Sequence, residues 1–431
     1  MKIPEVILIE VQHAPGNLSK VLAEVGNAGL IIEGLQAIKK TQNKTTWELT
    51  IDIDEDSGEE LFNRINQLPI SRIVGKSDRV FTKHLGGKIE TISRIPIDSL
   101  QTLRDVYTPG VARVCLAIQK EPTLVNKYTN ISNTVAIVTN GTAILGLGDV
   151  GSVAGLPVME GKAALFHSLV GLSGIPILLE SRDPTKIVET ITSISGSFGA
   201  IQLEDIAAPD CFEIEQSLIQ RINKPVLHDD QHGTAVVVLA ALLNATRRER
   251  KELSCCTVGQ IGLGAAGFGI SRLLIKYGVG KMLGADLNEG ALARLEKLGG
   301  VRATLSELMS EADIVVATTG VKGLIRPEFV RKGQIILSLS NPEPEIDPNL
   351  ALSKGACFAA DGGIVNNVLA FPGLFKGALD ARATRFTDEM LFAAAKCIFD
   401  CTEEDALFPN PLDRTIHKRV AEAVEKAAYG V

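Results

Sequence analysis

The 431-residue sequence lacks several features that would place it in a specialised class. No uncharged apolar run approaches the ~20 residues of a transmembrane helix. The N-terminus meets Pro15 and Gly16 too early for a secretory signal. Positive charge is not in excess, because the net charge is −7. We therefore expect no membrane span, no cleaved leader and no nucleic-acid partner.

Cysteines are few, odd in number and scattered along the chain. This pattern is typical of a reducing compartment, so we predict a cytoplasmic protein. Cys397 and Cys401 could share a helix face and bind a metal, but the spacing lacks partner ligands. Two buried thiols are the favoured interpretation. Hydrophobic residues make up 45% of the chain, which is enough for more than one core.

The first 75 residues predict a small α+β unit. Apolar strand patterns cover 5–12, 30–38, 45–54 and 71–75, and helical patterns cover 15–29 and 58–68. In the third strand Trp47, Leu49, Ile51 and Ile53 alternate with polar residues. The order βαββαβ predicts one sheet with both helices on one face. We place this first domain at residues 1–78.

A different pattern starts near Lys83, where strand-like and helical segments alternate. The strand-like runs cover 134–141, 174–180, 200–206 and 224–230. This alternation predicts an α/β fold with a parallel sheet wrapped by helices. A polar break covers 246–253, and the βα alternation then starts again. We therefore predict a second domain at 79–246 and a Rossmann-type domain with C-terminal helices at 247–431.

A glycine motif lies between the strand at 255–261 and the helix that follows it. Gly262, Gly264 and Gly267 have the spacing of a dinucleotide-binding turn, in the strand–turn–helix context that this motif requires. Gly264 lets the backbone approach a pyrophosphate, and Gly267 lets the helix pack closely on the strand. The next strand ends in Asp286, which is placed to bind a ribose 2′-OH. A carboxylate there repels a 2′-phosphate, so the sequence favours NAD over NADP.

Two adjacent pairs of acidic residues follow two of the predicted strands. Glu204 and Asp205 form one pair, and Asp229 and Asp230 form the other. Each pair alone is more commonly a solvated loop or a helix cap. Because both pairs follow strand ends, where open α/β sheets bind ligands, they suggest a shared site. Carboxylates without cysteine suit Mg²⁺ or Mn²⁺.

Four further polar residues are ambiguous from their type alone. Tyr107 precedes a turn, and Lys162 begins an apolar helical segment; most such residues are exposed or pack in a core. Asn341 and Asn367 are turn formers by default, but both follow strands on the cofactor side. Their amides could therefore face a ligand.

Several motifs together resemble the malic enzymes. They are "YTPGVA", "AILGLGD", "GLPVMEGKAALF", "LEDIAAP", "HDDQHGTA", the glycine motif, "SNPEPE" and "NNVLAFPG", and the similarity covers roughly residues 83–400. The resemblance implies oxidative decarboxylation of L-malate to pyruvate and CO₂ with a nicotinamide cofactor and a divalent cation. The same resemblance implies metal ligands at Glu204, Asp205 and Asp230. It implies that Lys162, with Asp229 beside it, is the general base and that Tyr107 is the general acid. It also implies substrate or nicotinamide contacts at Asn341 and Asn367.

Two questions stay open at this level, and the chemistry adds one expectation. Ala143 stands where larger malic enzymes carry an arginine for the substrate carboxylate. A lysine beside a divalent cation should have a depressed pKa, as a base at neutral pH requires. The alternatives to the NAD-reducing reaction are a malolactic-type lyase that retains NAD and a non-catalytic amino-acid sensor.

The N-terminal domain resembles an ACT domain, a small regulatory module. That resemblance implies an amino-acid effector near Pro15–Leu18, at a helix N-terminus. It also implies paired copies, so we expect a homodimer or a larger homo-oligomer. A packing or dimerisation domain without a ligand is the alternative.

Overall fold

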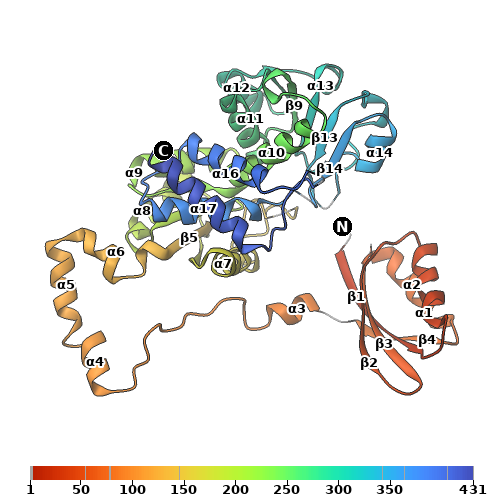
Figure 1. Cartoon of the computed structure of the whole chain (residues 1–431), viewed down its shortest axis with the longest axis horizontal. Coiled ribbons are helices and arrows are strands. Elements are labelled where there is room, and N and C mark those ends of the chain that lie inside the picture. The colour runs from red at the N-terminus through yellow and green to blue at the C-terminus, as the bar shows by residue number, and fades with distance from the viewer. Residues whose placement is uncertain are drawn as a thin grey trace. The chain divides into compact units, whose positions relative to one another are not determined.

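The structure is a computed structural model that describes residues 3–53, 55–76, 79–144, 146–341, 343–363, 365–404 and 406–430. The chain divides into two compact units, Met1–Lys88 and Ile89–Val431 (Figure 1). The predicted end of the first domain, residue 78, lies outside the described residues. The predicted boundary at 246/247 falls inside a helix of the second unit, and the three-domain division stays a prediction. None of the described helices is long and apolar enough to cross a membrane.

The first unit has the predicted βαββαβ order. Its elements are β1 Ile3–Gln12, α1 Asn17–Asn27, β2 Ile32–Lys40, β3 Lys44–Ile53, α2 Glu55–Gln67 and β4 Ser71–Lys76. The antiparallel sheet has the order β2-β3-β1-β4. Ile9 of β1 pairs with Trp47 of β3 on the face that packs against Val21 of α1 and Ile65 of α2. Both helices therefore cover one face of the sheet, as the order βαββαβ predicts.

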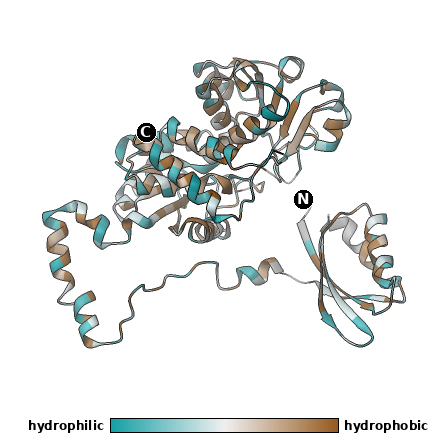
Figure 2. Cartoon of the chain, viewed as in Figure 1, coloured by the Kyte–Doolittle hydropathy of each residue, from teal (hydrophilic) through white to brown (hydrophobic). Residues whose placement is uncertain are grey.

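A run of helices precedes the first parallel sheet. It contains α3 Arg79–His84, α4 Leu100–Val106, α5 Val111–Lys120 and α6 Val125–Tyr128. No residue of α4, α5 or α6 is buried. Both α4 and α5 nevertheless carry hydrophobic residues, which are brown in Figure 2. We call residues 100–128 the arm.

The first sheet of the second unit is parallel and has the order β6-β5-β7-β8. Its strands are β5 Thr134–Thr139, β6 Ser173–Leu178, β7 Ala200–Leu203 and β8 Val226–His228. Its helices are α7 Leu156–Val170, α8 Pro184–Ile194, α9 Asp210–Arg221 and α10 Asp229–Arg248. One face packs on α7 and α10 and the other on α8 and α9. Burial on both faces explains the continuous apolar run of β5.

The second sheet is also parallel, with the order β11-β10-β9-β12-β13-β14. Its strands are β9 Thr257–Ile261, β10 Lys281–Ala285, β11 Val301–Arg302, β12 Ile314–Ala317, β13 Ile335–Ser338 and β14 Phe358–Asp361. α11 Ala265–Tyr277 and α12 Glu289–Lys297 cover one face, and α13 Leu305–Glu311 and α14 Pro348–Ser353 cover the other. The strand order reverses between β9 and β12, which is where doubly wound sheets bind nucleotides. The predicted α/β Rossmann-type class is confirmed.

Three C-terminal helices return to the first sheet. They are α15 Phe371–Asp380, α16 Asp388–Asp400 and α17 Arg414–Ala428. α15 and α17 pack on α7, and α16 packs on α10. Phe166 of α7 meets Phe371 and Phe375 of α15 edge to face, with ring centroids 5.0 and 5.5 Å apart. The segment before α15 is thereby brought to the first sheet, although it follows the second sheet in sequence.

Candidate active site

Three carboxylates converge at the carboxyl ends of β7 and β8. Glu204 and Asp205 follow β7, and Asp230 lies in the first turn of α10, directly after β8. One oxygen from each lies within 4.8 Å of the others, and among the described residues no other group of this kind occurs. Asp205 has a left-handed backbone with φ 52°, and its N–H donates to Asp230 Oδ2 at 2.9 Å. Three hard oxygen donors without sulfur fit Mg²⁺ or Mn²⁺.

Lys162 of α7 extends into the same cluster. Its Nζ donates a short hydrogen bond to Asp229 Oδ2 and lies 3.0 Å from Glu204 Oε1. The ammonium also lies 4.3 Å from the centroid of the Phe371 ring. Only 8% of the residue is exposed. The lysine therefore sits between the proposed metal ligands and the aromatic wall of α15.

Burial and charge shift the pKa values of this cluster. Burial raises the pKa of Glu204 to about 7 and those of Asp229 and Asp230 to about 6, although Lys162 opposes each shift. Burial alone would lower the pKa of Lys162, but the charges of Asp229 and Glu204 outweigh it and raise this pKa above its ordinary value. The direction is opposite to the depression expected beside a cation. The reason is that the negative charges of Asp229 and Glu204 stabilise the protonated ammonium.

Asp229 is held by partners from two distant parts of the chain. Its Oδ2 accepts from Lys162 and, at 2.8 Å, from Asn367 Nδ2, which the C-terminal segment supplies. A Cβ atom at Gly233 would lie 1.9 Å from Asp229 Oδ1. Gly233 is therefore required for the position of this carboxylate, which the sequence analysis missed. The signal was a glycine four residues after an aspartate, on the same helix face.

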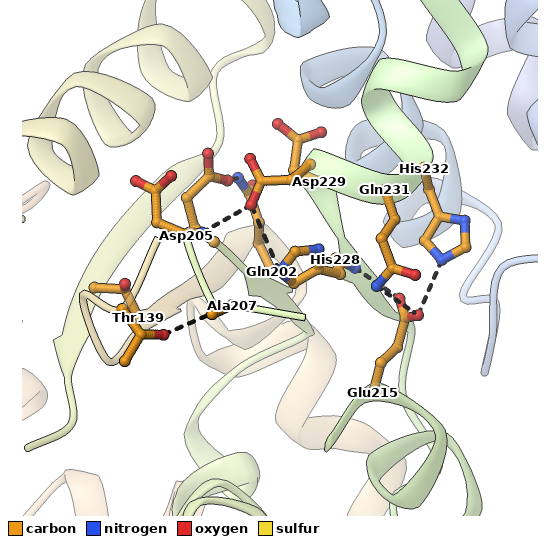
Figure 3. Close-up of polar contacts among 12 residues, drawn as sticks. Thr139, Gln202, Asp205, Ala207, Glu215, His228, Asp229, Gln231 and His232 are labelled. Carbon is orange, nitrogen blue, oxygen red and sulfur yellow. Dashed lines mark hydrogen bonds and ion pairs between the residues drawn. The ribbon is translucent and has the colours of Figure 1, made fainter. Parts of the chain in front are cut away.

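A buried glutamate fixes the start of α10. Glu215 of α9 accepts from the N–H of His228 at 2.7 Å and from His232 Nε2 at 3.0 Å (Figure 3). Burial would raise the pKa of Glu215, but the charges and hydrogen bonds of His232 and His228 together outweigh it and lower this pKa. On the other side of the site, Gln202 Nε2 donates to Glu204 Oε2 at 2.6 Å. Glu215 and Gln202 were not among the predicted site residues, although each is a polar residue within an otherwise buried pattern.

The glycine motif adopts the geometry of a dinucleotide-binding turn. Gly262 has φ 83°, and a Cβ atom at Gly267 would lie 1.9 Å from the Gly262 carbonyl oxygen. Asp286, at the end of β10, accepts from the N–H groups of Leu263 at 2.6 Å and Asn288 at 2.7 Å. A cavity of about 770 Å³ is lined by Gly262, Gly264 and Asp286. Its position at the N-terminus of α11 suits a pyrophosphate.

Two predicted residues are not enclosed by either site. Tyr107 directly follows α4 in the arm, as its C-terminal cap, and has 67% of its surface exposed. Asn341 follows β13 and is exposed, and its Nδ2 donates to the Gly362 carbonyl at 3.4 Å. The structure thus groups five of the predicted residues with Lys162 and places three, Gly262, Gly264 and Asp286, along the cavity. The roles of all of them stay predictions.

A doubly wound nucleotide fold beside a lysine–carboxylate cluster is typical of metal-dependent dehydrogenases. The sequence matches "Malic enzyme, N-terminal domain" over residues 86–187 and "Malic enzyme, NAD binding domain" over 294–429. It is 52% identical to NAD-dependent malic enzyme 1 of Bacillus subtilis, over 98% of this chain and 97% of that protein. It is 40% identical to the NAD-dependent malic enzyme of Geobacillus stearothermophilus, over 96% of this chain and 92% of that protein.

The fold comparison agrees with the sequence comparison. The crystal structure of the NAD-dependent malic enzyme from Thermotoga maritima matches with a TM-score of 0.76 and 38% identity, over 81% of this chain and 99% of that one. The chain therefore belongs to the malic enzyme family.

Proposed function

We propose that the protein catalyses the NAD-dependent oxidative decarboxylation of L-malate to pyruvate and CO₂. The observation that carries the proposal is the position of Lys162, bonded to Asp229 and Glu204 where three carboxylates converge. The family and its NAD-dependent relatives support the cofactor, as does the cavity at the glycine motif. Seven free cysteines support a cytoplasmic location.

The residues of the cluster divide the chemistry between them. When bound, a divalent cation at Glu204, Asp205 and Asp230 supplies Lewis-acid polarisation of substrate oxygens, and NAD at the cavity accepts a hydride. Lys162 takes the proton of the C2 hydroxyl, since it is the buried amine beside the ligands. Its pKa must fall for this role, and it falls when the negative charge of the carboxylates is offset. Asp229 orients Lys162, and Asn367 in turn holds Asp229.

A substrate screen tests this proposal. NADH formation is measured with malate, lactate, tartrate and oxaloacetate, with Mn²⁺ and with a chelator. We expect NADH and pyruvate from malate in equal amounts, and loss of both with the chelator. Lactate formed from malate without net NADH would instead establish the malolactic-type reaction. No turnover of any substrate would favour the non-catalytic sensor.

We also propose that Tyr107 protonates C3 of the enolpyruvate intermediate in the site of a second copy of the chain. Support comes from the arm, which buries no residue of its own helices. The exposed fractions of its side chains are 76% for Leu100, 65% for Leu116 and 67% for Tyr107. A surface with exposed apolar residues of this kind is typical of a protein interface. The protein is then a homodimer or a larger homo-oligomer, with each arm contributing its tyrosine to a neighbour.

Complementation between two inactive variants tests this arrangement. Tyr107→Phe and Lys162→Ala are co-expressed with different tags, and the mixed dimer is purified through both tags. If Tyr107 acts in the partner, one site of the mixed dimer keeps both residues, and about half of the wild-type activity should return. If Tyr107 acts in its own chain, each site of the mixed dimer lacks one residue and activity stays absent.

For the first unit we propose a small amino acid as effector. A cavity of about 410 Å³ at the N-terminus of α1 is lined by His13, Pro15, Leu18, Thr45 and Trp47. Trp47 is the single tryptophan of the chain, so its fluorescence reports on this cavity directly. Titration of the full chain with each of the twenty amino acids should change the emission for one of them. No change at millimolar concentration, and unchanged malate turnover, would leave the unit a packing domain.

A further inference from the structure

The cavity at Asp286 contains a single positively charged side chain. Among the described residues that line it, the ionisable ones are Asp286, Glu289, Glu307 and Arg302. Arg302 ends β11, which lies beside β10, the strand that leads to Asp286. The arginine is thus at the same edge of the sheet as the proposed ribose contact. In related folds an arginine in this region accommodates the 2′-phosphate of NADP.

The guanidinium of Arg302 uses three of its five N–H donors to bond two glutamates of α12. Its Nε donates to Glu296 Oε1 at 2.8 Å, and its Nη2 donates to Glu296 Oε2 at 3.0 Å. Its Nη1 donates to Glu289 Oε2 at 3.0 Å. Each of the three nitrogens therefore has a carboxylate partner. The two-point contact with Glu296 is the planar geometry in which arginine also binds phosphate.

We propose that Glu289 and Glu296 withhold Arg302 from a 2′-phosphate, and that this pairing selects NAD over NADP together with Asp286. The inference rests on the proposed ribose contact at Asp286. A 2′-phosphate at this edge would meet the carboxylates of Asp286 and Glu289, and the cation that could offset them is already paired. Removing the two glutamate charges leaves Arg302 free to bind the phosphate.

The expected effect is moderate because the pairing is partly solvated. The side chains of Arg302 and Glu296 are 46% and 43% exposed, and that of Glu289 is 79% exposed. Exposed ion pairs alter equilibria by at most about fivefold each. We therefore expect the double variant Glu289→Gln/Glu296→Gln to shift the NADP-to-NAD ratio by roughly three- to tenfold towards NADP.

The test compares cofactor binding as well as turnover. Dissociation constants of NADPH and NADH are measured by calorimetry on the full chain, and kcat/KM is measured with both oxidised cofactors. Adding Arg302→Ala to the double variant should abolish the shift. The matched control is Glu311→Gln/Glu328→Gln, which removes the same charge from exposed positions that do not line the cavity. This control should leave the ratio unchanged.

Three results would overturn the inference. They are an unchanged ratio in the glutamate variant, a shift that survives the loss of Arg302, and an equal shift in the matched control. If the glutamate variant does not fold, Asp286→Ser is compared with Asp286→Ser/Arg302→Ala instead. The variant that also lacks Arg302 must then bind NADPH several-fold more weakly than Asp286→Ser. Asp286→Ser alone tests the ribose contact. If Asp286→Ser weakens NADH binding but the glutamate variant does not change the NADP-to-NAD ratio, the proposed pairing is wrong and the proposed function stands.

Discussion

The carboxyl ends of β7 and β8 carry four carboxylates, whereas those of β9 and β10 carry a glycine turn and one carboxylate, Asp286. Both sheets are parallel and doubly wound, and both place their sites at equivalent edges. The first sheet concentrates charge around a buried lysine, which suits a cation and a proton transfer. The second leaves an open cavity with backbone N–H groups, which suits an extended cofactor. The shared architecture thus fixes where ligands bind, and the residues after each strand decide which ligands they are.

The two sites also differ in how their acidic residues are held. Asp229 is fully buried, and side chains of Lys162 and Asn367 contact it. Asp286 is held by the backbone N–H groups of Leu263 and Asn288. Changes in the first cluster should therefore abolish chemistry, whereas changes around Asp286 should alter only selectivity.

The largest effect is expected at Lys162. Lys162→Ala should lower kcat for malate by roughly 10²–10⁴-fold, because it removes the proposed general base. NADH binding, measured by calorimetry, should stay close to that of the wild type. The matched control is Lys186→Ala, an exposed lysine of α8, which should keep full activity. Near-normal malate oxidation by Lys162→Ala would remove Lys162 from the mechanism.

A second large effect is expected at Asp230. Asp230→Asn should weaken Mn²⁺ binding strongly, because it removes the charge of a proposed metal ligand. The loss should exceed the ~10–100-fold that is typical when a residue that only hydrogen-bonds to a metal ligand is changed. Mn²⁺ affinity is measured by electron paramagnetic resonance. Asp210→Asn, in the exposed first turn of α9, is the control and should bind Mn²⁺ normally. Equal affinities in the two variants would refute the metal assignment.

Proton competition should produce a smaller effect. The pKa values of Glu204, about 7, and Asp230, about 6, are raised by burial. Since the cation binds the deprotonated carboxylates, metal affinity should fall as the pH falls through these values. Because both carboxylates must be deprotonated, we expect Mn²⁺ affinity to be roughly a hundredfold weaker at pH 5.5 than at pH 7.5. A flat profile between these values would show that the carboxylates stay ionised throughout.

The smallest effect is expected at Asp286. Asp286→Asn keeps an oxygen acceptor for Leu263 but loses the charge, so the preference for NAD over NADP should fall by about tenfold. Steady-state kcat/KM with both cofactors measures this. Asp347→Asn is the matched control, because Asp347 also accepts a backbone hydrogen bond in the same sheet region, at the start of α14. An unchanged preference in Asp286→Asn would remove this residue from cofactor selection.

Much of the fold and of both sites could be predicted from local patterns. Strand periodicity locates the strands, and the acidic pairs and glycine spacing predict where ligands bind. Gly233 and Glu215 each have a local signal, but their roles could not be predicted, because these depend on contacts with Asp229 and His232 that only the folded helices create. The place where Tyr107 acts could not be predicted either, because it depends on what covers the arm.

The return of α15 to α7 has a consequence for synthesis on the ribosome. Asn367 and Phe371 contact Asp229 and Lys162, which are made roughly 140 to 210 residues earlier. A nascent chain therefore exposes an unfinished cluster until both sheets and the following helix have left the exit tunnel. Chains that stop before this point contain the proposed metal ligands but lack the wall around the lysine. The order of residues along the gene thus delays assembly of this site until most of the polypeptide has been made.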